Sequence, residues 1–189
     1  MNEQSLGVLL ASGNVIRCHT IPTIKPQTVG AHTWRAVVIL HWLYAPAYPP
    51  APLTYALTVH DVPELKTGDM PGDTKHANSA LAAALERSEA EFLLAHGIAD
   101  DTSLTHTERC VLGLCDRADL VMYALDEVEM GNLNMLHVAV KAYSMAQEQC
   151  VLGLMASCSH ALYDRSQILM QGMYDRLQNN IRRVAAWQN

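Results

Sequence analysis

Residues 60–71 read HDVPELKTGDMP, and the adjacent pair His60-Asp61 closes an apolar segment that begins near residue 53. Pro63 follows, and the residue before a proline is disfavoured in helical geometry, so we expect the helix to end there. Two neighbouring side chains on a helix lie about 100° apart, and they can converge on one ion only where the helix frays. The stretch therefore predicts a helix end that presents His60 and Asp61 together, followed by a polar loop.

Two other segments carry residues of the same kinds. His32 lies one turn inside an apolar stretch, and Asp119 lies within another, where an unpaired carboxylate would be costly to bury. Asp116, one turn earlier, is the competing carboxylate, but its neighbour Arg117 makes it resemble half of a solvated charge pair. Two imidazoles and two carboxylates suffice for one divalent metal of the Zn, Mn, Co or Fe type. The expected ligands are His32, His60, Asp61 and Asp119.

The composition favours one helical domain. With 189 residues the chain is long enough to bury a core, and we expect a single domain over residues 1–189. Half of the residues are hydrophobic but only 6% are aromatic, which suits helix packing better than a sheet sandwich. The net charge of −6 argues against nucleic acid as the main partner, because proteins that bind its backbone usually carry a basic face. A nucleotide is compatible, since a metal and a few cations can hold it.

The cysteines and the apolar segments bear on location. The five cysteines are odd in number and include no C-x-x-C pair, which is typical of buried thiols in a reducing cytoplasm. No targeting signal is visible at the amino terminus, because the apolar run over 5–11 is short and lacks a basic flank. The most apolar stretch, 29–44, contains His32, Arg35 and His41 and is expected to be a fully buried core helix, not a membrane span. We expect a cytoplasmic protein without a membrane partner (host cytoplasm for a viral one).

The hydrophobic periodicity predicts helices and loops, without the two-residue alternation of strands. Thr105 and Glu108 have the spacing of a capping box, and Gly131 marks the end of the helix that they open. The expected helices span residues 5–10, 28–44, 53–62, 74–96, 105–130, 134–155 and 159–187. The prediction is an all-α domain of six to seven helices.

One ordered set of residues resembles the HD-domain phosphohydrolases, and within them the bacterial 5′-deoxynucleotidases and the phage dATP triphosphohydrolases. The set comprises Arg17, Ala31-His32-Thr33, His60-Asp61, Glu64, Thr67-Gly68-Asp69-Met70-Pro71, Lys75, Ala118-Asp119 and Glu127-x-x-x-Gly131-Asn132. It covers about residues 15–135, and its Thr-Gly-Asp-x-Pro segment is far more specific than the His-Asp pair. The resemblance implies an all-α HD domain in which a metal-bound water attacks phosphorus.

The resemblance also implies a role for each matched position. Arg17 and Lys75 would grip phosphate, and Asp69 would accept a hydrogen bond from the sugar 3′-OH. Glu64 would orient or deprotonate the attacking water, next to Asp61, which would be both ligand and catalytic residue. The metal would be held by His32, His60, Asp61 and Asp119. Its identity stays open among Co, Mn, Zn, Mg and Fe.

Three positions depart from the family pattern. Ala31 stands where many relatives have Glu, so a carboxylate that supports the metal-binding histidine is missing or supplied elsewhere. Pro63 lies inside the His-Asp-x-x-Glu motif and affects the placement of Glu64. Cys18 follows Arg17 where the deoxynucleotidases have Trp, at a position that the resemblance implies is close to the sugar, and this leaves the selectivity for deoxyribose open.

The leading prediction is a dNTP triphosphohydrolase, with dATP as the substrate that the resemblance implies. It rests on cations that gather in sequence around the motif loops: Arg17, Lys25, Arg35, Lys66, Lys75 and His76. The alternative is a 5′-deoxynucleotidase that converts dNMPs to deoxynucleoside and phosphate. The rival of another class is a non-catalytic helical protein that binds metal or nucleotide without turnover.

The last expected helix bears on assembly. A mostly apolar stripe follows three- and four-residue steps through Leu162, Ser166, Leu169, Met173, Leu177, Ile181 and Val184. Aromatic and Met side chains, which are enriched in interfaces, lie beside it at Tyr163, Met170, Tyr174 and Trp187. We expect a homo-oligomer built on two-fold contacts. The alternative is that the stripe packs only on its own domain.

Overall fold

Helices make up about three quarters of the fold. The computed structural model describes residues 3–99, 104–149, 153–154 and 159–187, apart from the side chains of Asp73, Lys75, His76, Gln149 and Trp187. The long helices are α1 (Glu3–Ser12), α2 (Val29–Tyr44), α3 (Ala51–Val59), α6 (Ser79–Ala95), α7 (His106–Glu129), α8 (Leu136–Gln149) and α9 (His160–Trp187). The short ones are α4 (Glu64–Thr67), α5 (Gly72–Ala77) and the 3-10 turn η1 (Leu133–Met135). The predicted all-α class is confirmed.

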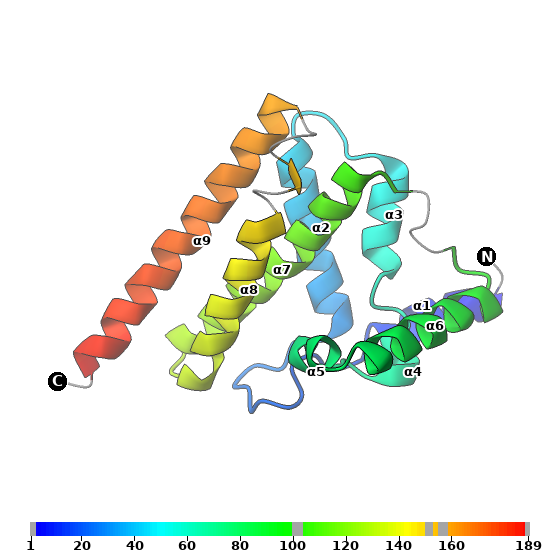
Figure 1. Cartoon of the computed structure of the whole chain (residues 1–189), viewed down its shortest axis with the longest axis horizontal. Helices are drawn as coiled ribbons and strands as arrows, with labels where there is room; N and C mark the ends of the chain where they lie inside the picture. The colour runs from blue at the N-terminus through cyan, green and yellow to red at the C-terminus, as the bar shows by residue number, and fades with distance from the viewer. Residues whose placement is uncertain (1–2, 100–103, 150–152, 155–158, 188–189) are drawn as a thin grey trace.

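Helix α7 is central and packs against α2, α3, α8 and α9 (Figure 1). It begins at the predicted capping box, where the Thr105 hydroxyl accepts the Glu108 N–H at 3.2 Å and Glu108 Oε2 accepts the Thr105 N–H at 2.8 Å. Its buried side chains are mostly apolar, and the two charged exceptions are Asp119 and Glu127. Buried carboxylates require partners, and the partners of these two build the site. Within the described helices, none is long and apolar enough to cross a membrane.

Helix α2 is less buried than its sequence predicts. Its inner face carries Val29, His32, Ala36, Leu40 and Leu43, at the three- and four-residue steps of one helix side. The opposite side exposes Trp34, Val38 and Trp42. The expectation of a fully buried helix is wrong, because α3, α7 and α9 cover only part of its circumference.

Two predicted helices are divided differently in the structure. The predicted helix 53–62 ends at Val59 with His60 as its C-cap, and after a turn Pro63 becomes the N-cap of α4. The predicted helix 74–96 is two helices, because Asn78 is extended (φ −141°, ψ 96°) and its side chain accepts the Leu81 N–H at 3.1 Å. Asn is a favoured N-cap residue, so it ends α5 and opens α6.

Residues 16–28 form a closed loop before α2. An isolated antiparallel bridge between Ile16 and Thr28 closes its base, next to a hydrogen bond of 2.9 Å from the Arg17 N–H to the Gln27 carbonyl. The loop therefore leaves and returns at one point, and it presents Arg17 at a fixed position beside the amino end of α2.

Helix α7 holds the far side of this loop through Glu127. The two oxygens of Glu127 accept the N–H groups of Ile24 and Lys25 at 2.7 Å each. Asn132 donates to Glu127 and to the Pro22 carbonyl at 2.8 Å each. The Glu127…Asn132 motif of the sequence therefore fixes the loop onto the core.

Candidate active site

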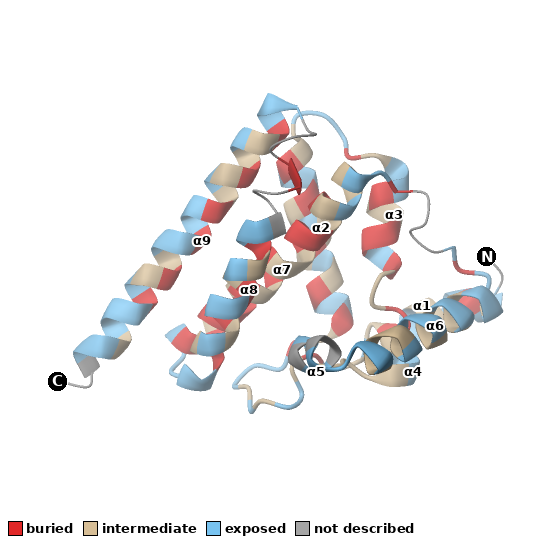
Figure 2. Ribbon diagram, viewed as in Figure 1, coloured by how far each residue is buried: buried red, intermediate tan, exposed pale blue. Residues whose placement is uncertain are grey.

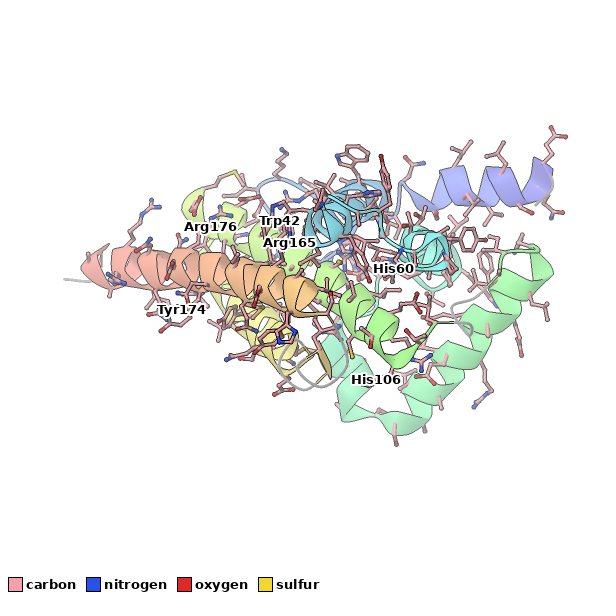
Figure 3. The ribbon with its side chains drawn as sticks, turned by 90° about the horizontal axis from the view of Figure 1, so that it is seen from above. Trp42, His60, His106, Arg165, Tyr174 and Arg176 are labelled. Carbon is pink, nitrogen blue, oxygen red and sulfur yellow. The ribbon has the colours of Figure 1, made fainter. Side chains whose placement is uncertain are left out.

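Four side chains from α2, the end of α3 and α7 converge at one point. His32 Nε2 lies 3.4 Å from His60 Nε2, 3.4 Å from Asp61 Oδ2 and 3.3 Å from Asp116 Oδ1. His60, labelled in Figure 3, has its Nε2 3.2 Å from Asp61 Oδ1. One ligand atom each of His32, His60 and Asp116 lie within 4.8 Å of one another, which makes the group a possible metal site. The structure thus brings together His32, His60 and Asp61 of the predicted set, with Asp116 where Asp119 was expected.

The chemistry of the cluster suits a divalent cation. Two imidazole nitrogens and carboxylate oxygens are ligands typical of Zn²⁺ and its neighbours. Asp61 Oδ2 is buried and has no hydrogen-bond donor among the described residues. Burial lowers the pKa of His32, but hydrogen bonds to Asp116 and Asp119 outweigh burial and raise that pKa to about 9. The site therefore favours a positive charge between its carboxylates, and a bound metal would supply it.

Asp119 lies on the other side of the His32 ring. Its Oδ2 is 2.7 Å from His32 Nδ1, the nitrogen that faces away from the cluster. The geometry thus puts Asp116 beside the candidate metal site, whereas the predicted ligand Asp119 contacts the nitrogen on the opposite side of the ring. Asp116 faces His32 rather than standing as half of a solvated pair with Arg117, and Arg117 donates to the Gly113 carbonyl at 3.0 Å.

Arg17 lies against the carboxylates of the cluster. Its Nη2 is 3.4 Å from Asp116 Oδ1 and its Nε is 3.8 Å from Asp61 Oδ2, and the residue is only 8% exposed. Two of its nitrogens, Nε and Nη1, donate no hydrogen bond within the described part of the chain. A buried guanidinium with spare donors beside a cation site is suited to bind a phosphate that also contacts the metal.

Cys18 and Asp69 are joined directly. Cys18 has a left-handed backbone (φ 54°), rare for residues other than glycine, and its N–H donates to Asp69 Oδ2 at 2.6 Å. Burial raises the pKa of the Cys18 thiol to about 11, so the thiol is neutral at neutral pH. Asp69 therefore holds the backbone that presents Arg17, a role that the sequence did not reveal.

A cavity of about 590 Å³ opens above the cluster. The floor carries residues predicted or identified above: Arg17, Cys18, Asp61, Glu64, Asp69 and Asp116. Pro63 does not displace Glu64 from the site, because as the N-cap it places Glu64 in the first turn of α4, at the cavity. Lys75 belongs to α5, and its side chain lies outside the described residues.

The outer walls come from α6 on one side and from α7 and α8 on the other. Helix α6 contributes Leu85, Glu86 and Glu89, and the opposite wall carries Arg117, His137 and Lys141. Sequence reasoning missed the second group, although His137 and Lys141 are four residues apart and hence on one face of a helix. Lys25, Arg35 and Lys66, which had been counted toward phosphate binding, are not among the cavity residues.

The helical fold and the H…HD…D order with its converging side chains define an HD-domain phosphohydrolase. A family model described as 5′-deoxynucleotidase YfbR-like matches residues 8–151, and the chain belongs to this family. It is therefore a hydrolase of deoxynucleotides, the class that its sequence predicts.

Two solved structures share the fold. The HD phosphohydrolase DatZ of cyanophage S-2L, determined with dA and one catalytic Zn²⁺ ion, is 19% identical with a TM-score of 0.71, over 95% of this chain and 98% of that one. An HD-domain phosphohydrolase of Listeria innocua is 17% identical with a TM-score of 0.60, over 92% of this chain and 98% of that one. No curated protein matches the sequence.

Proposed function

We propose that the protein is a metal-dependent phosphohydrolase that cleaves the bond between the 5′ oxygen and the α-phosphorus of a deoxynucleotide, releasing the deoxynucleoside. The observation that carries the proposal is the convergence of His32, His60, Asp61 and Asp116 beneath a cavity that also holds Arg17 and Glu64. The dA and the catalytic Zn²⁺ of the DatZ structure support a deoxynucleoside and a zinc-type metal as the ligand classes.

The residues at the cavity have separate roles in the proposed reaction. When bound, a divalent metal supplies a nucleophilic water at neutral pH and polarises the phosphoryl oxygen. Glu64 orients this water or accepts its proton. The spare N–H groups of Arg17 bind phosphoryl oxygens and balance the charge that grows on them in the transition state. Asp69, with Oδ2 held by the Cys18 amide, offers Oδ1 to the sugar 3′-OH, and Lys75 remains a proposed phosphate contact.

The charge of the cavity favours a monophosphate substrate. Six described carboxylates line it: Asp61, Glu64, Asp69, Glu86, Glu89 and Asp116. Of the Lys and Arg side chains that the structure describes, Arg17, Arg117 and Lys141 line it. Even with a divalent metal the lining is not cationic, so it opposes each added phosphate charge. We therefore place the dNMP ahead of the dNTP that the sequence favoured.

The deoxynucleoside triphosphate is the second candidate. Arg117, His137 and Lys141 approach the cavity from one wall, where they can meet a longer phosphate chain. The same wall has apolar side chains, Leu120, Val138 and Met145, against which a base can pack. Adenine is the base implied by the sequence resemblance, and the dA of the DatZ structure supports it.

A product assay tests the function. The purified chain, loaded in turn with Mn, Co, Zn, Mg or Fe, is incubated with dNMPs, dNTPs and NMPs, and the released phosphate species are identified. We expect deoxynucleoside and orthophosphate from dNMPs.

Glu64→Gln should retain its metal but turn over about a hundredfold more slowly, whereas Glu91→Gln, an exposed site on α6, should behave as wild type. Tripolyphosphate from dNTPs would establish the second candidate, and metal binding without any turnover would make the protein non-catalytic.

We also propose that residues 1–189 act as one cytoplasmic domain and that copies of the chain associate. The free thiols of Cys18, Cys110 and Cys115 support a reducing compartment.

A second groove, of about 360 Å³, lies between α2, α7 and α9 and supports association. Its lining is apolar: Val38, Ile39, Trp42, Met122, Ile168, Leu169, Gly172 and Met173.

A further inference from the structure

A line of charged groups leads from His32 to the last helix. Asp119 meets His32 Nδ1 with Oδ2 and accepts the Arg35 Nε–H with Oδ1. Arg35 Nη1 continues to Asp126 Oδ2 at 3.3 Å, and Asp126 Oδ1 accepts from Arg176 Nη2 of α9 at 2.6 Å. Arg176 is labelled in Figure 3, where α9 passes the end of α7. Each guanidinium bridges two carboxylates, so the line is continuous from the candidate metal site to α9.

The inner end of this line is fully buried. Asp119 is 0% exposed, and Gln27 Nε2 donates to its Oδ2 at 2.8 Å. A carboxylate opposite Nδ1 keeps the proton there and turns the Nε2 lone pair of His32 toward a metal. Ala31, the neighbour of His32 in the sequence, has no carboxylate that could hold the Nδ1 proton. Asp119 of α7 supplies this carboxylate instead. Arg35 follows His32 by three residues on α2, hence on the same face, and so it can hold the free oxygen of Asp119.

We propose that Arg35 is a positioning residue for the metal site, and that Arg176, acting through Asp126, extends this positioning to α9. The proposal rests on the proposed function only in that the cluster binds a metal. The residues that the family model matches end at 151, before α9 begins at His160. The docking of a helix outside the matched region therefore influences the orientation of His32.

The effects should be graded along the line. Arg35 touches the buried carboxylate directly, so its loss should disturb His32 most. Arg176 acts one carboxylate further out, and its side chain is 33% exposed, so solvent screens its pairing with Asp126. If the line served only to attach α9, stability without metal would fall but metal affinity would not change.

The affinity of the full-length protein for Zn²⁺ and Mn²⁺ separates these roles, measured by competition with a chelating dye alongside thermal unfolding without metal. Arg165→Gln is the matched control, because Arg165 also joins α9 to the body but does so at α2, where it donates to the Trp42 carbonyl at 2.8 Å. We expect Arg35→Gln to weaken metal binding by about tenfold or more and Arg176→Gln by about threefold. Arg165→Gln should stay within about twofold of wild type, and Arg35→Lys should recover most of the loss.

Wild-type affinity in Arg35→Gln would overturn the proposal, as would an equal loss in Arg165→Gln and Arg176→Gln. If Arg35→Gln fails to fold, Asp126→Asn is the deciding variant, because it removes the acceptor shared by Arg35 and Arg176. The proposal requires that Asp126→Asn weaken metal binding. Failure of the wild-type protein to bind either metal would instead refute the proposed function.

Discussion

Asp116 and Asp119 lie one helical turn apart on α7 and face opposite nitrogens of the His32 ring. We expect Asp116→Asn to lose bound metal and activity, because a neutral amide replaces a carboxylate of the candidate metal site. Asp119→Asn should still bind metal, about 10- to 100-fold more weakly, since it removes only the support of a ligand. Metal content after gel filtration and a titrated dissociation constant measure the difference.

Far-UV circular dichroism of both variants is the control for folding. Retention of metal in Asp116→Asn together with its loss in Asp119→Asn would restore the assignment made from the sequence.

The sequence predicts part of this site. His32, His60 and Asp61 meet as the H…HD order suggests, although their role as ligands remains a prediction. The choice between Asp116 and Asp119 depends on tertiary structure, because both lie on one apolar helix with identical chemistry. One feature of the sequence bears on this choice. Arg35 lies three residues after His32 on the same helix face, and it pairs with Asp119, the carboxylate that supports the His32 ring.

At the scale of elements, Glu129 joins α7 to α9. It accepts hydrogen bonds from Arg176 at 2.7 and 2.8 Å and from Asn180 at 3.1 Å. The bonds from Arg176 are the main cause that lowers the pKa of Glu129 from 4.5 to about 2. Because the folded pKa lies below the ordinary value, the contact stabilises fully above about pH 4.5, and this stabilisation is lost as the pH falls toward about 2.

Glu129→Gln should therefore lower the free energy of unfolding at pH 7 by on the order of 0.5 kcal/mol, a small value because the pair is partly exposed and screened. The difference from wild type should shrink below about pH 4.5. Urea unfolding at pH 7, 5 and 3.5 measures it, with Glu148→Gln, an exposed position on α8, as the control. A difference that is constant over this range would contradict the ion-pair explanation.

Helix positions were predictable where local signals are strong. The capping box at Thr105 marks the start of α7 to within a residue. The break at Asn78 was missed, since an Ala- and Glu-rich pattern continues through it and one capping side chain decides the interruption. Helix α4 was missed because four residues are too few to show a period. Periodicity also overestimates burial in α2, since an apolar residue such as Trp34 can face solvent.

At the scale of the molecule, most of the predicted stripe on α9 serves its own core. Figure 2 shows buried positions recurring along one side of α9, and they include Leu162, Met173 and Leu177. Ile181 of the same stripe is partly exposed. The stripe alone therefore gives little support for association. The outer side of α2 next to α9 also exposes apolar side chains, and the apolar groove lies there.

This face carries the prediction of a two-fold homo-oligomer. Large apolar side chains are exposed on both helices here: Trp34, Val38, Trp42 and Ile168. Exposed apolar patches mark interaction sites, and Trp and Tyr are enriched in interfaces. Light scattering at micromolar concentration should give a multiple of the 20.8 kDa chain. Ile168→Glu should shift the mass toward the monomer, whereas Leu94→Glu, an exposed position on α6, should not. A wild-type mass of one chain, or equal dissociation of both variants, would refute association through this face.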